Sequence, residues 1–192
     1  LALEKARRLA DEGFNTLLTC YNAPLSEHLR QIAGSEDNLT VLGFHKLCKK
    51  MVDKASEESG RNLIGEARGS YPGMDLWDHH YPIALAYALE ILDERYDAIV
   101  VDEGQDFGEE FWFPIEILLS DGDRSPLYIF YDENQNVYTR ASTFPTDTAP
   151  ITLTVNCRNT RKIHEAAYHF YSGSVIEAPN IAGEDIQVIE AS

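Results

Sequence analysis

Two adjacent carboxylates follow a continuous apolar stretch of the sequence. Residues 98–101, Ala-Ile-Val-Val, lead directly into residues 102–106, Asp-Glu-Gly-Gln-Asp. An apolar run of this kind is typical of a strand that is buried on both faces of a parallel sheet. The simplest interpretation is a polar turn where that strand ends. The alternative is a ligand site, because open α/β sheets bind ligands at the carboxyl ends of their strands. One acid there could hold magnesium, and the next could orient or deprotonate an attacking water.

Polar side chains also follow two later strand-like segments. Asp132 and Gln135 come after the apolar residues 127–131, and Arg158 follows residues 151–156. A parallel sheet would bring the ends of these strands to one edge. An acid pair, an amide and a guanidinium together supply what a phosphoryl-transfer site needs, namely a metal holder, a water orienter and a charge stabiliser.

Helical and strand patterns alternate along the chain, which predicts an α/β fold with a parallel, doubly wound sheet. We predict strands at residues 16–21, 39–44, 98–103, 127–131, 151–156 and 186–191. We predict helices in the opening amphipathic segment up to Gly13 and at residues 24–33, 45–59, 82–94, 109–121 and 159–173. Residues 60–80 are rich in glycine and aperiodic, so a loop or a small insertion is expected there.

The composition limits the setting of the protein. The chain carries 16 Lys and Arg against 32 Asp and Glu, a formal net charge of −16. Such a charge argues against broad, non-specific binding to a phosphate backbone, but it allows a local basic groove and carboxylate-bound magnesium. The three cysteines show no CxxC spacing, so neither a disulfide framework nor a zinc site is indicated. We therefore expect a reduced, cytoplasmic setting, and no apolar run predicts a membrane span.

Five segments resemble motifs of the UvrD/Rep-like superfamily 1 helicases. DEGQD, DENQNVY and NCRNTRKI are similar to motifs II, III and IV, which are roughly DExQD, GDxxQxIY and NYRSxxxI. Residues 17–30, LLTCYNAPLSEHLR, resemble motif Ia, and residues 41–51, VLGFHKLCKKM, resemble motif Ib. The five segments occur in family order over nearly the whole chain. The resemblance implies an incomplete P-loop NTPase (RecA-like) fold, a doubly wound parallel sheet flanked by helices, with ATP and Mg²⁺ as cofactors.

The resemblance assigns roles at the nucleotide site. Asp102 matches the acid that holds magnesium (the Walker B position), and Glu103 matches the general base that activates water. Gln105 and Asp106 complete the acidic box and are expected to bridge the metal site to motif III. The hydrolase chemistry implied is ATP hydrolysis, coupled in the family to movement along single-stranded DNA.

The resemblance also assigns contacts outside the acidic box. Gln135 matches the glutamine that senses the γ-phosphate, and Arg158 matches the arginine that reaches it across the interdomain cleft. Contacts with single-stranded DNA, with RNA as a further possibility, are implied for Tyr21, Asn22, Phe44, His45 and Tyr138. Aromatic side chains suit this role because stacking on bases grips a strand without reading its sequence.

The chain departs from the family at several positions. None of its 12 glycines is followed by lysine, so the Walker A loop GxxxxGKT is missing. Tyr131 stands where motif III has glycine, and Cys157 stands where motif IV usually has tyrosine. The opening helix has no start signal. We therefore expect a fragment whose partners include the remaining helicase domains: residues 1–150 as domain 1A without its P-loop, with a small insertion near 60–95, and residues 151–192 as the hinge and start of domain 2A.

Two interpretations of the function remain open. The first is a fragment of an ATP-dependent DNA helicase or translocase, inactive as an isolated chain. The second is a non-catalytic, P-loop-less module that binds protein or nucleic acid, which the net charge of −16 favours slightly.

Individual residues carry alternatives too. Tyr21 and Phe44 could be core aromatics, and His45 could be a polar residue at a helix start. The pairs His79-His80 and His164/His169 lack the spacing of a metal site, so structural roles are expected for them.

Overall fold

A computed structural model describes residues 1–132, 144–146, 148–155, 159–170 and 175–185. The chain divides into two compact units, Leu1–Pro145 and Thr146–Ser192, which are described separately. The first unit contains the sheet and the acidic box. The sequence placed the division near residue 150, a few residues further along.

The first unit is built on a four-stranded parallel sheet with the strand order β2-β1-β3-β4. Its strands are β1 (Thr16–Cys20), β2 (Leu39–Val41), β3 (Ala98–Asp102) and β4 (Leu127–Ile129). The register pairs Thr16 with Ala98 and Cys20 with Asp102. The two central strands are buried on both faces, as their unbroken apolar runs predicted. The α/β class and the parallel sheet are therefore confirmed.

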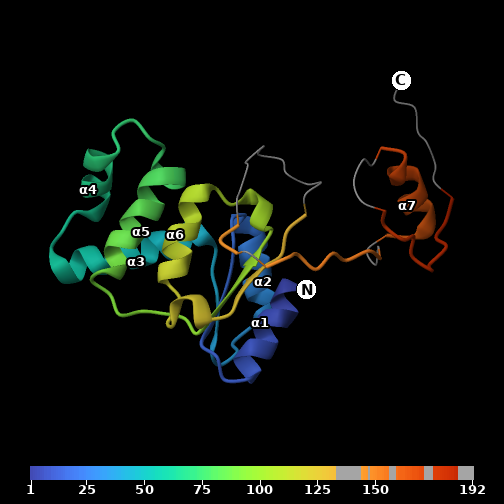
Figure 1. Ribbon diagram of the computed structural model, residues 1–192, viewed down its shortest axis with the longest axis horizontal. Helices are drawn as coiled ribbons and strands as arrows, with labels where there is room; N and C mark the ends of the chain where they lie inside the picture. Colours follow the sequence, from blue (N-terminus) through green and yellow to red (C-terminus); the bar gives the residue numbers. More distant parts are fainter. Residues whose placement is uncertain (133–143, 147, 156–158, 171–174, 186–192) are drawn as a thin grey trace. The chain divides into compact units, whose positions relative to one another are not determined.

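Helices cover both faces of this sheet (Figure 1). Helices α1 (Ala2–Asp11) and α2 (Ala23–Ala33) pack on one face. Helices α3 (Phe44–Ser59), α5 (Tyr81–Leu89) and α6 (Glu109–Ile117) lie side by side on the other. This arrangement is doubly wound, because the crossover from β1 to β2 places α2 on one face, whereas the crossovers from β2 to β3 and from β3 to β4 place α3, α5 and α6 on the other.

The alternation of side chains along the central strands separates two cores. Ile99 and Val101 belong to the larger cluster, under α3, α5 and α6, whereas Ala98 and Val100 belong to the smaller one, under α1 and α2. The same period of two directs the side chain of Asp102 to the face that α1 covers. The strand pattern thus decides on which side of the sheet the first acid lies.

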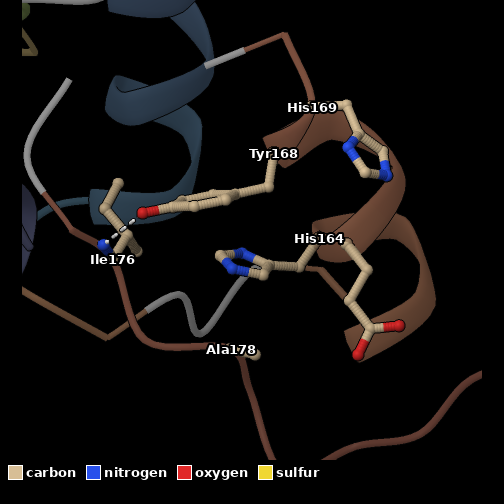
Figure 2. Close-up of a pocket in the computed structure, with 6 residues that line it drawn as sticks. His164, Tyr168, His169, Ile176 and Ala178 are labelled. Atoms are coloured by element: carbon tan, nitrogen blue, oxygen red, sulfur yellow. Dashed lines mark hydrogen bonds between the residues drawn. The ribbon is translucent and has the colours of Figure 1, made fainter. Parts of the chain in front are cut away.

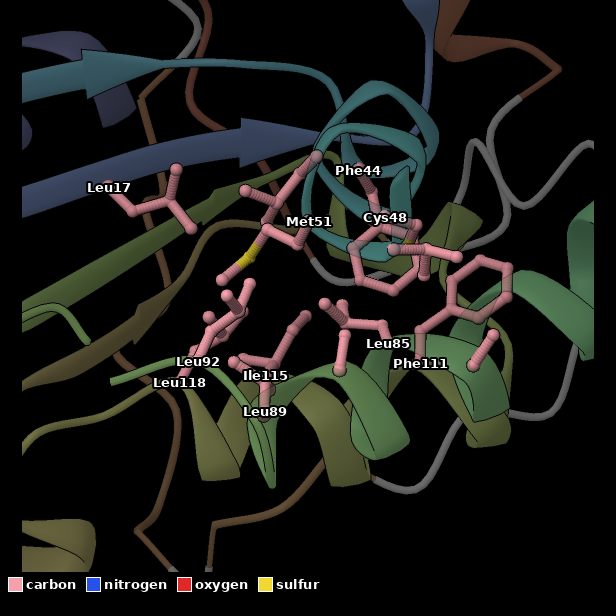
Figure 3. Close-up of a cluster of buried hydrophobic side chains, with 14 of the residues drawn as sticks. Leu17, Phe44, Cys48, Met51, Leu85, Leu89, Leu92, Phe111, Ile115 and Leu118 are labelled. Atoms are coloured by element: carbon pink, nitrogen blue, oxygen red, sulfur yellow. The ribbon is translucent and has the colours of Figure 1, made fainter. Parts of the chain in front are cut away.

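The larger cluster packs α5 and the segment 60–80 against the sheet (Figure 3). Phe44, Cys48, Met51 and Ala55 follow helical spacing on α3 and are buried against α5, α6 and Leu17 of β1. Each large apolar side chain buried in this way contributes about 1.5–3 kcal/mol relative to an exposed one.

The segment 60–80, predicted as a loop or small insertion, is largely helical. Helix α4 (Leu63–Ser70) begins at Asn62, whose side chain accepts a hydrogen bond from Gly65 N at 2.9 Å. A π-helix, η1 (Leu76–His80), follows it and leads directly into α5. The loop prediction was wrong because Gly65 and Gly69 lower helix propensity, while the Asn62 cap and the buried Leu63 and Ala67 offset that loss.

Short helical turns complete the first unit. They are the 3₁₀ turns η2 (Gly104–Asp106) and η3 (Gly122–Arg124). The predicted helices 82–94 and 109–121 end earlier, at Leu89 and Ile117. No helix of the described residues has the length and apolar character needed to cross a membrane.

The second unit contains helix α7 (Arg161–Tyr168), shorter than the predicted helix over 159–173. The predicted strand 151–156 is wrong over the described residues 151–155, which form only an isolated bridge between Val155 and Glu177. Ile151 and Leu153 are exposed, so the apolar pattern of this segment is not satisfied by burial within the unit. The predicted strand 186–191 lies outside the described residues.

Candidate functional site

The acidic box forms a tight turn directly after β3. The backbone of Glu103 adopts the left-handed conformation, with φ 53° and ψ 49°, which is uncommon for a residue other than glycine. The turn then continues as η2, with Asp106 N donating to Glu103 O at 3.0 Å. Conformations of this kind persist where neighbouring contacts enforce them, and they are frequent at functional sites.

The neighbouring strand β4 enforces this turn through Gly104. The backbone N–H of Gly104 donates to Phe130 O at 2.8 Å, and Phe130 N donates to Val101 O at 2.9 Å. A Cβ atom at position 104 would lie 2.5 Å from Ile129 Cγ2, so a side chain there would push the turn away from β4. Glycine is therefore required where the acidic turn crosses the end of the next strand.

Gln105 joins the acidic turn to the end of β4. Its side chain is buried, with 5% of its surface exposed. The amide Nε2 donates to Glu103 Oε2 at 2.6 Å, and Oε1 accepts from Asp132 N at 3.0 Å. One amide therefore contacts both the Glu103 carboxylate and the backbone of Asp132, three residues after the end of β4. This is the kind of bridge between the acidic box and residues 131–138 that the sequence led us to expect.

Three carboxylates concentrate negative charge at this edge, and Cys20 reports their effect. Burial first, and then the charges of Asp102, Glu103 and Asp106, raise the pKa of the Cys20 thiol to about 12, against a backbone hydrogen bond at Asn22 that lowers it. The thiol at the end of β1 is therefore neutral at physiological pH and is no nucleophile. A field that disfavours a thiolate favours a cation.

The acidic turn offers carboxylates for a metal contact but, among the described residues, no complete set of metal ligands. No three His, Cys, Asp or Glu side chains within the described residues are grouped closely enough to hold a metal by themselves. Magnesium commonly uses one or two carboxylates together with substrate phosphates and waters. Asp102, half-buried at the end of β3, suits that role. The sequence contains no Gly-Lys pair, so a Walker A cradle for the phosphates is not among its residues.

Tyr21 and His45, expected to contact nucleic acid, lie together beside the acidic edge. Their ring centroids are 5.1 Å apart in an edge-to-face arrangement, and Tyr21 stacks on Phe111 of α6 at 6.0 Å. Tyr21 Oη lies 3.3 Å from Asp78 Oδ1, and His45 Nε2 lies 3.9 Å from the same oxygen. Both side chains are half-buried, so each combines packing with partial access to solvent.

Asn22 and Phe44 have clear structural roles. The Asn22 side chain caps α2 by accepting from Leu25 N at 3.0 Å. Phe44 is fully buried between Phe107 and Phe111, with ring centroids 5.5 and 4.7 Å away. No face of its ring is open to a base, so the predicted stacking contact is corrected to the core role that the sequence offered as its alternative.

The sequence missed an aromatic pair in the segment that it assigned to a loop. Trp77 of η1 and Tyr81 of α5 stack with centroids 4.5 Å apart. The signal was their spacing of four residues, which brings two side chains onto one helical face.

Nearby, His79 Nε2 lies 3.2 Å from Glu110 Oε1, and the His80 ring meets Tyr71 O at 2.9 Å. The two histidines therefore have structural partners, as expected.

The second unit has a separate open pocket of about 460 Å³ around α7 (Figure 2). His164 is buried and stacks on Tyr168 at 5.0 Å, and Tyr168 Oη accepts from Ile176 N at 3.3 Å. His169 is exposed, and Figure 2 shows its ring away from that of His164. His164 therefore packs within the unit, whereas His169 lies at its surface.

Three of the predicted site residues, Gln135, Tyr138 and Arg158, lie outside the described residues. Among the described residues, the structure brings together the acidic box, Asp132 after β4 and the end of β1. The sequence matches no protein-family model, and a search of curated proteins also finds no match.

Proposed function

We propose that this chain is part of the motor of an ATP-dependent superfamily 1 DNA helicase or translocase, and that the carboxyl edge of β1, β3 and β4 is its nucleotide-hydrolysis site. The observation that carries the proposal is the Gln105 side chain, which contacts both the Glu103 carboxylate and Asp132 N. A buried amide placed in this way holds a carboxylate in one orientation and links it to the segment that follows β4.

Each residue of the turn has a distinct role in this proposal. Asp102 would hold Mg²⁺, which neutralises charge on the phosphates when bound. Glu103 accepts the proton of the attacking water, and the Gln105 amide orients its carboxylate. The left-handed turn at Glu103, fixed by Gly104 against β4, presents that carboxylate beyond the end of the sheet.

The remaining parts of the proposed site come from other segments. Gln135 would sense the γ-phosphate, Arg158 would stabilise it, and Tyr138 would stack on the DNA strand. The phosphate cradle and the rest of the second motor domain would come from the other helicase domains of the parent protein, because the chain has no Gly-Lys pair. We expect the 192-residue chain by itself to hydrolyse no ATP.

The test is ATP hydrolysis by the full-length product of the gene that encodes this chain, with and without single-stranded DNA. Glu103→Gln should lower the stimulated rate at least about 100-fold, because general-base catalysis contributes about 10²–10⁴-fold. The matched control is Glu116→Gln, the same substitution at an exposed position of α6. It should leave the rate unchanged.

The same assay decides on the second candidate, a non-catalytic binding module. The missing Gly-Lys pair and the charge of −16 favour it. Equal rates in the unmodified protein and the Glu103→Gln variant would contradict the helicase proposal. Binding of single strands without any hydrolysis would establish the module.

A further inference from the structure

We propose that Trp77, stacked on Tyr81 beside Lys49 of α3, is a stacking site for a base of a single-stranded nucleic acid. The proposal rests on the proposed function, whose strand-binding surface it locates in η1 and α5. None of the five motif-like segments includes these residues.

The exposed ring of Trp77 is the first observation. It keeps 43% of its surface exposed although the Tyr81 ring lies nearly parallel to it, at 4.5 Å and 17°. Tyr81 itself is half-buried against the core. The pair is therefore a partly exposed aromatic surface with one ring anchored, which suits stacking on a base of any sequence.

The ring of Trp77 is also held in place. The carboxylate of Asp75 caps η1 by accepting from Trp77 N at 2.7 Å and from Asp78 N at 2.8 Å. These backbone hydrogen bonds, with that of Asp78 the larger, lower the pKa of Asp75. The His45 ring meets Trp77 edge to face at 5.7 Å. A ring fixed before binding loses little conformational freedom when a base stacks on it.

A cation adjoins this surface although the chain as a whole is acidic. Lys49 of α3 lies near Tyr81, which contributes to raising the pKa of Lys49 after the larger effect of Asp53. The ion pair of Lys49 with Asp53, at 2.5 Å, is exposed and therefore weak, so a phosphate that flanks a stacked base competes for the ammonium.

The acids near the surface already have partners. Asp75 is occupied by the two amides that it caps, Asp78 contacts Tyr21 Oη, and Asp53 pairs with Lys49 at 2.5 Å. A flat ring beside Lys49 suits a single strand, which offers bases and phosphates together.

The surface connects to the acidic edge through consecutive ring contacts. Trp77 contacts His45, His45 contacts Tyr21, and Tyr21 follows the last residue of β1, which pairs with Asp102. A strand that stacks on Trp77 would therefore lie on the side of α3 that carries His45. The rings of His45 and Tyr21 lie between that strand and the proposed hydrolysis site.

Intrinsic fluorescence tests the proposal on the 192-residue chain itself, because the chain has only two tryptophans. Trp112 is 3% exposed, so only Trp77 can meet a base. Titration with a twelve-residue oligothymidylate at about 50 mM salt should quench the fluorescence in a saturable way. The Trp77→Phe variant should bind the oligonucleotide but show no such quenching. Absence of quenching in the unmodified chain would overturn the proposal.

Affinity provides the second measurement, by anisotropy of a labelled oligothymidylate. Trp77→Ala should raise Kd by about 30-fold, the middle of the range for loss of one stacked base, and Trp77→Phe should restore most of the affinity. The control is Phe113→Ala, which removes a ring that is 63% exposed on α6, and it should leave Kd unchanged. An unchanged Kd in Trp77→Ala would also overturn the proposal.

The two proposals fail separately. If the chain shows no quenching but ATP hydrolysis by the full-length protein is still lowered by Glu103→Gln, only the stacking site is contradicted. If the chain shows quenching but the full-length protein hydrolyses no ATP, the stacking site is supported and the motor proposal is contradicted.

Discussion

The acidic turn after β3 and the aromatic surface on η1 both hold polar or aromatic side chains at the edge of the first unit, but they hold them differently. At the acidic turn, backbone bonds to β4, the Gly104 contact and the Gln105 amide fix the carboxylate of Glu103 from several directions. At the aromatic surface, one cap and ring-on-ring contacts hold Trp77, and much of its ring remains open.

Glu103 is held more firmly than Trp77, and the proposed function gives a reason for this difference. A general base must be within hydrogen-bond reach of one water, so small displacements are costly. A stacking surface accepts any base and tolerates some freedom. Changes at the acidic turn should therefore propagate into the sheet, whereas changes at the aromatic surface should remain local.

The largest expected effect comes from one substitution, glycine to alanine, made at the acidic turn and in α4, the helix that precedes η1. Gly104→Ala would place a Cβ 2.5 Å from Ile129 Cγ2, and overpacking of this kind costs about 1–3 kcal/mol. Gly69→Ala, in exposed α4, meets nothing within 4 Å and should stabilise the chain by about 0.5–1 kcal/mol. Urea unfolding of both variants measures the difference.

Effects of the same sign in these two variants would contradict the comparison. If Gly104→Ala were tolerated without loss, the acidic turn would have room to move away from β4, and the role of Gly104 in fixing Glu103 would be wrong.

A second effect, of intermediate size, tests the charge at the acidic turn. Burial and the three carboxylates raise the pKa of Cys20 from 9.0 to about 12. The folded state therefore keeps a proton that the unfolded state releases above its own pKa, so this group lowers stability as pH rises from about 9 towards 12. Between pH 8 and 10 the loss should be about 1.4 kcal/mol.

Urea unfolding at the two pH values, with Cys20→Ala for comparison, isolates this contribution. The variant should lose about 1.4 kcal/mol less than the unmodified chain over the same interval. Cys48, whose burial also raises its pKa, is common to both proteins and cancels. An equal loss in both proteins would show that Cys20 is not in the negative environment described.

The sheet could be predicted from the sequence because its signals are local and strong. The apolar runs of β1 and β3 satisfy burial on both faces, and the acids at 102–106 follow directly from the end of β3. The Gln105 bridge was expected only through the resemblance, since its two partners lie 2 and 27 residues away. Phe44 was misassigned because a ring after a strand end suits a core and a stacking site equally well.

The segment 60–80 could not be predicted for a physical reason. Its glycines weaken helix propensity, and its helices are stabilised by packing of Leu63 and Ala67 on distant parts of α3 and α5. The strand predicted at 151–156 failed in the opposite way. Its apolar pattern is present, but among the described residues of its unit only Val155 forms a bridge, with Glu177.

The smallest expected effect tests whether the aromatic surface is held locally. Asp75→Ala removes the cap from Trp77 N and Asp78 N, and exchange of these two amides should accelerate by up to about tenfold while exchange within β3 stays unchanged. Asp75→Ser, which can cap, is the matched control. Because the caps lower the pKa of Asp75, the same loosening should appear in the unmodified chain as pH falls through that lowered pKa. Hydrogen exchange followed by mass spectrometry measures both. Acceleration that extends into β3 would mean that the two regions form one cooperative unit, and the stacking surface would then be coupled directly to the acidic turn.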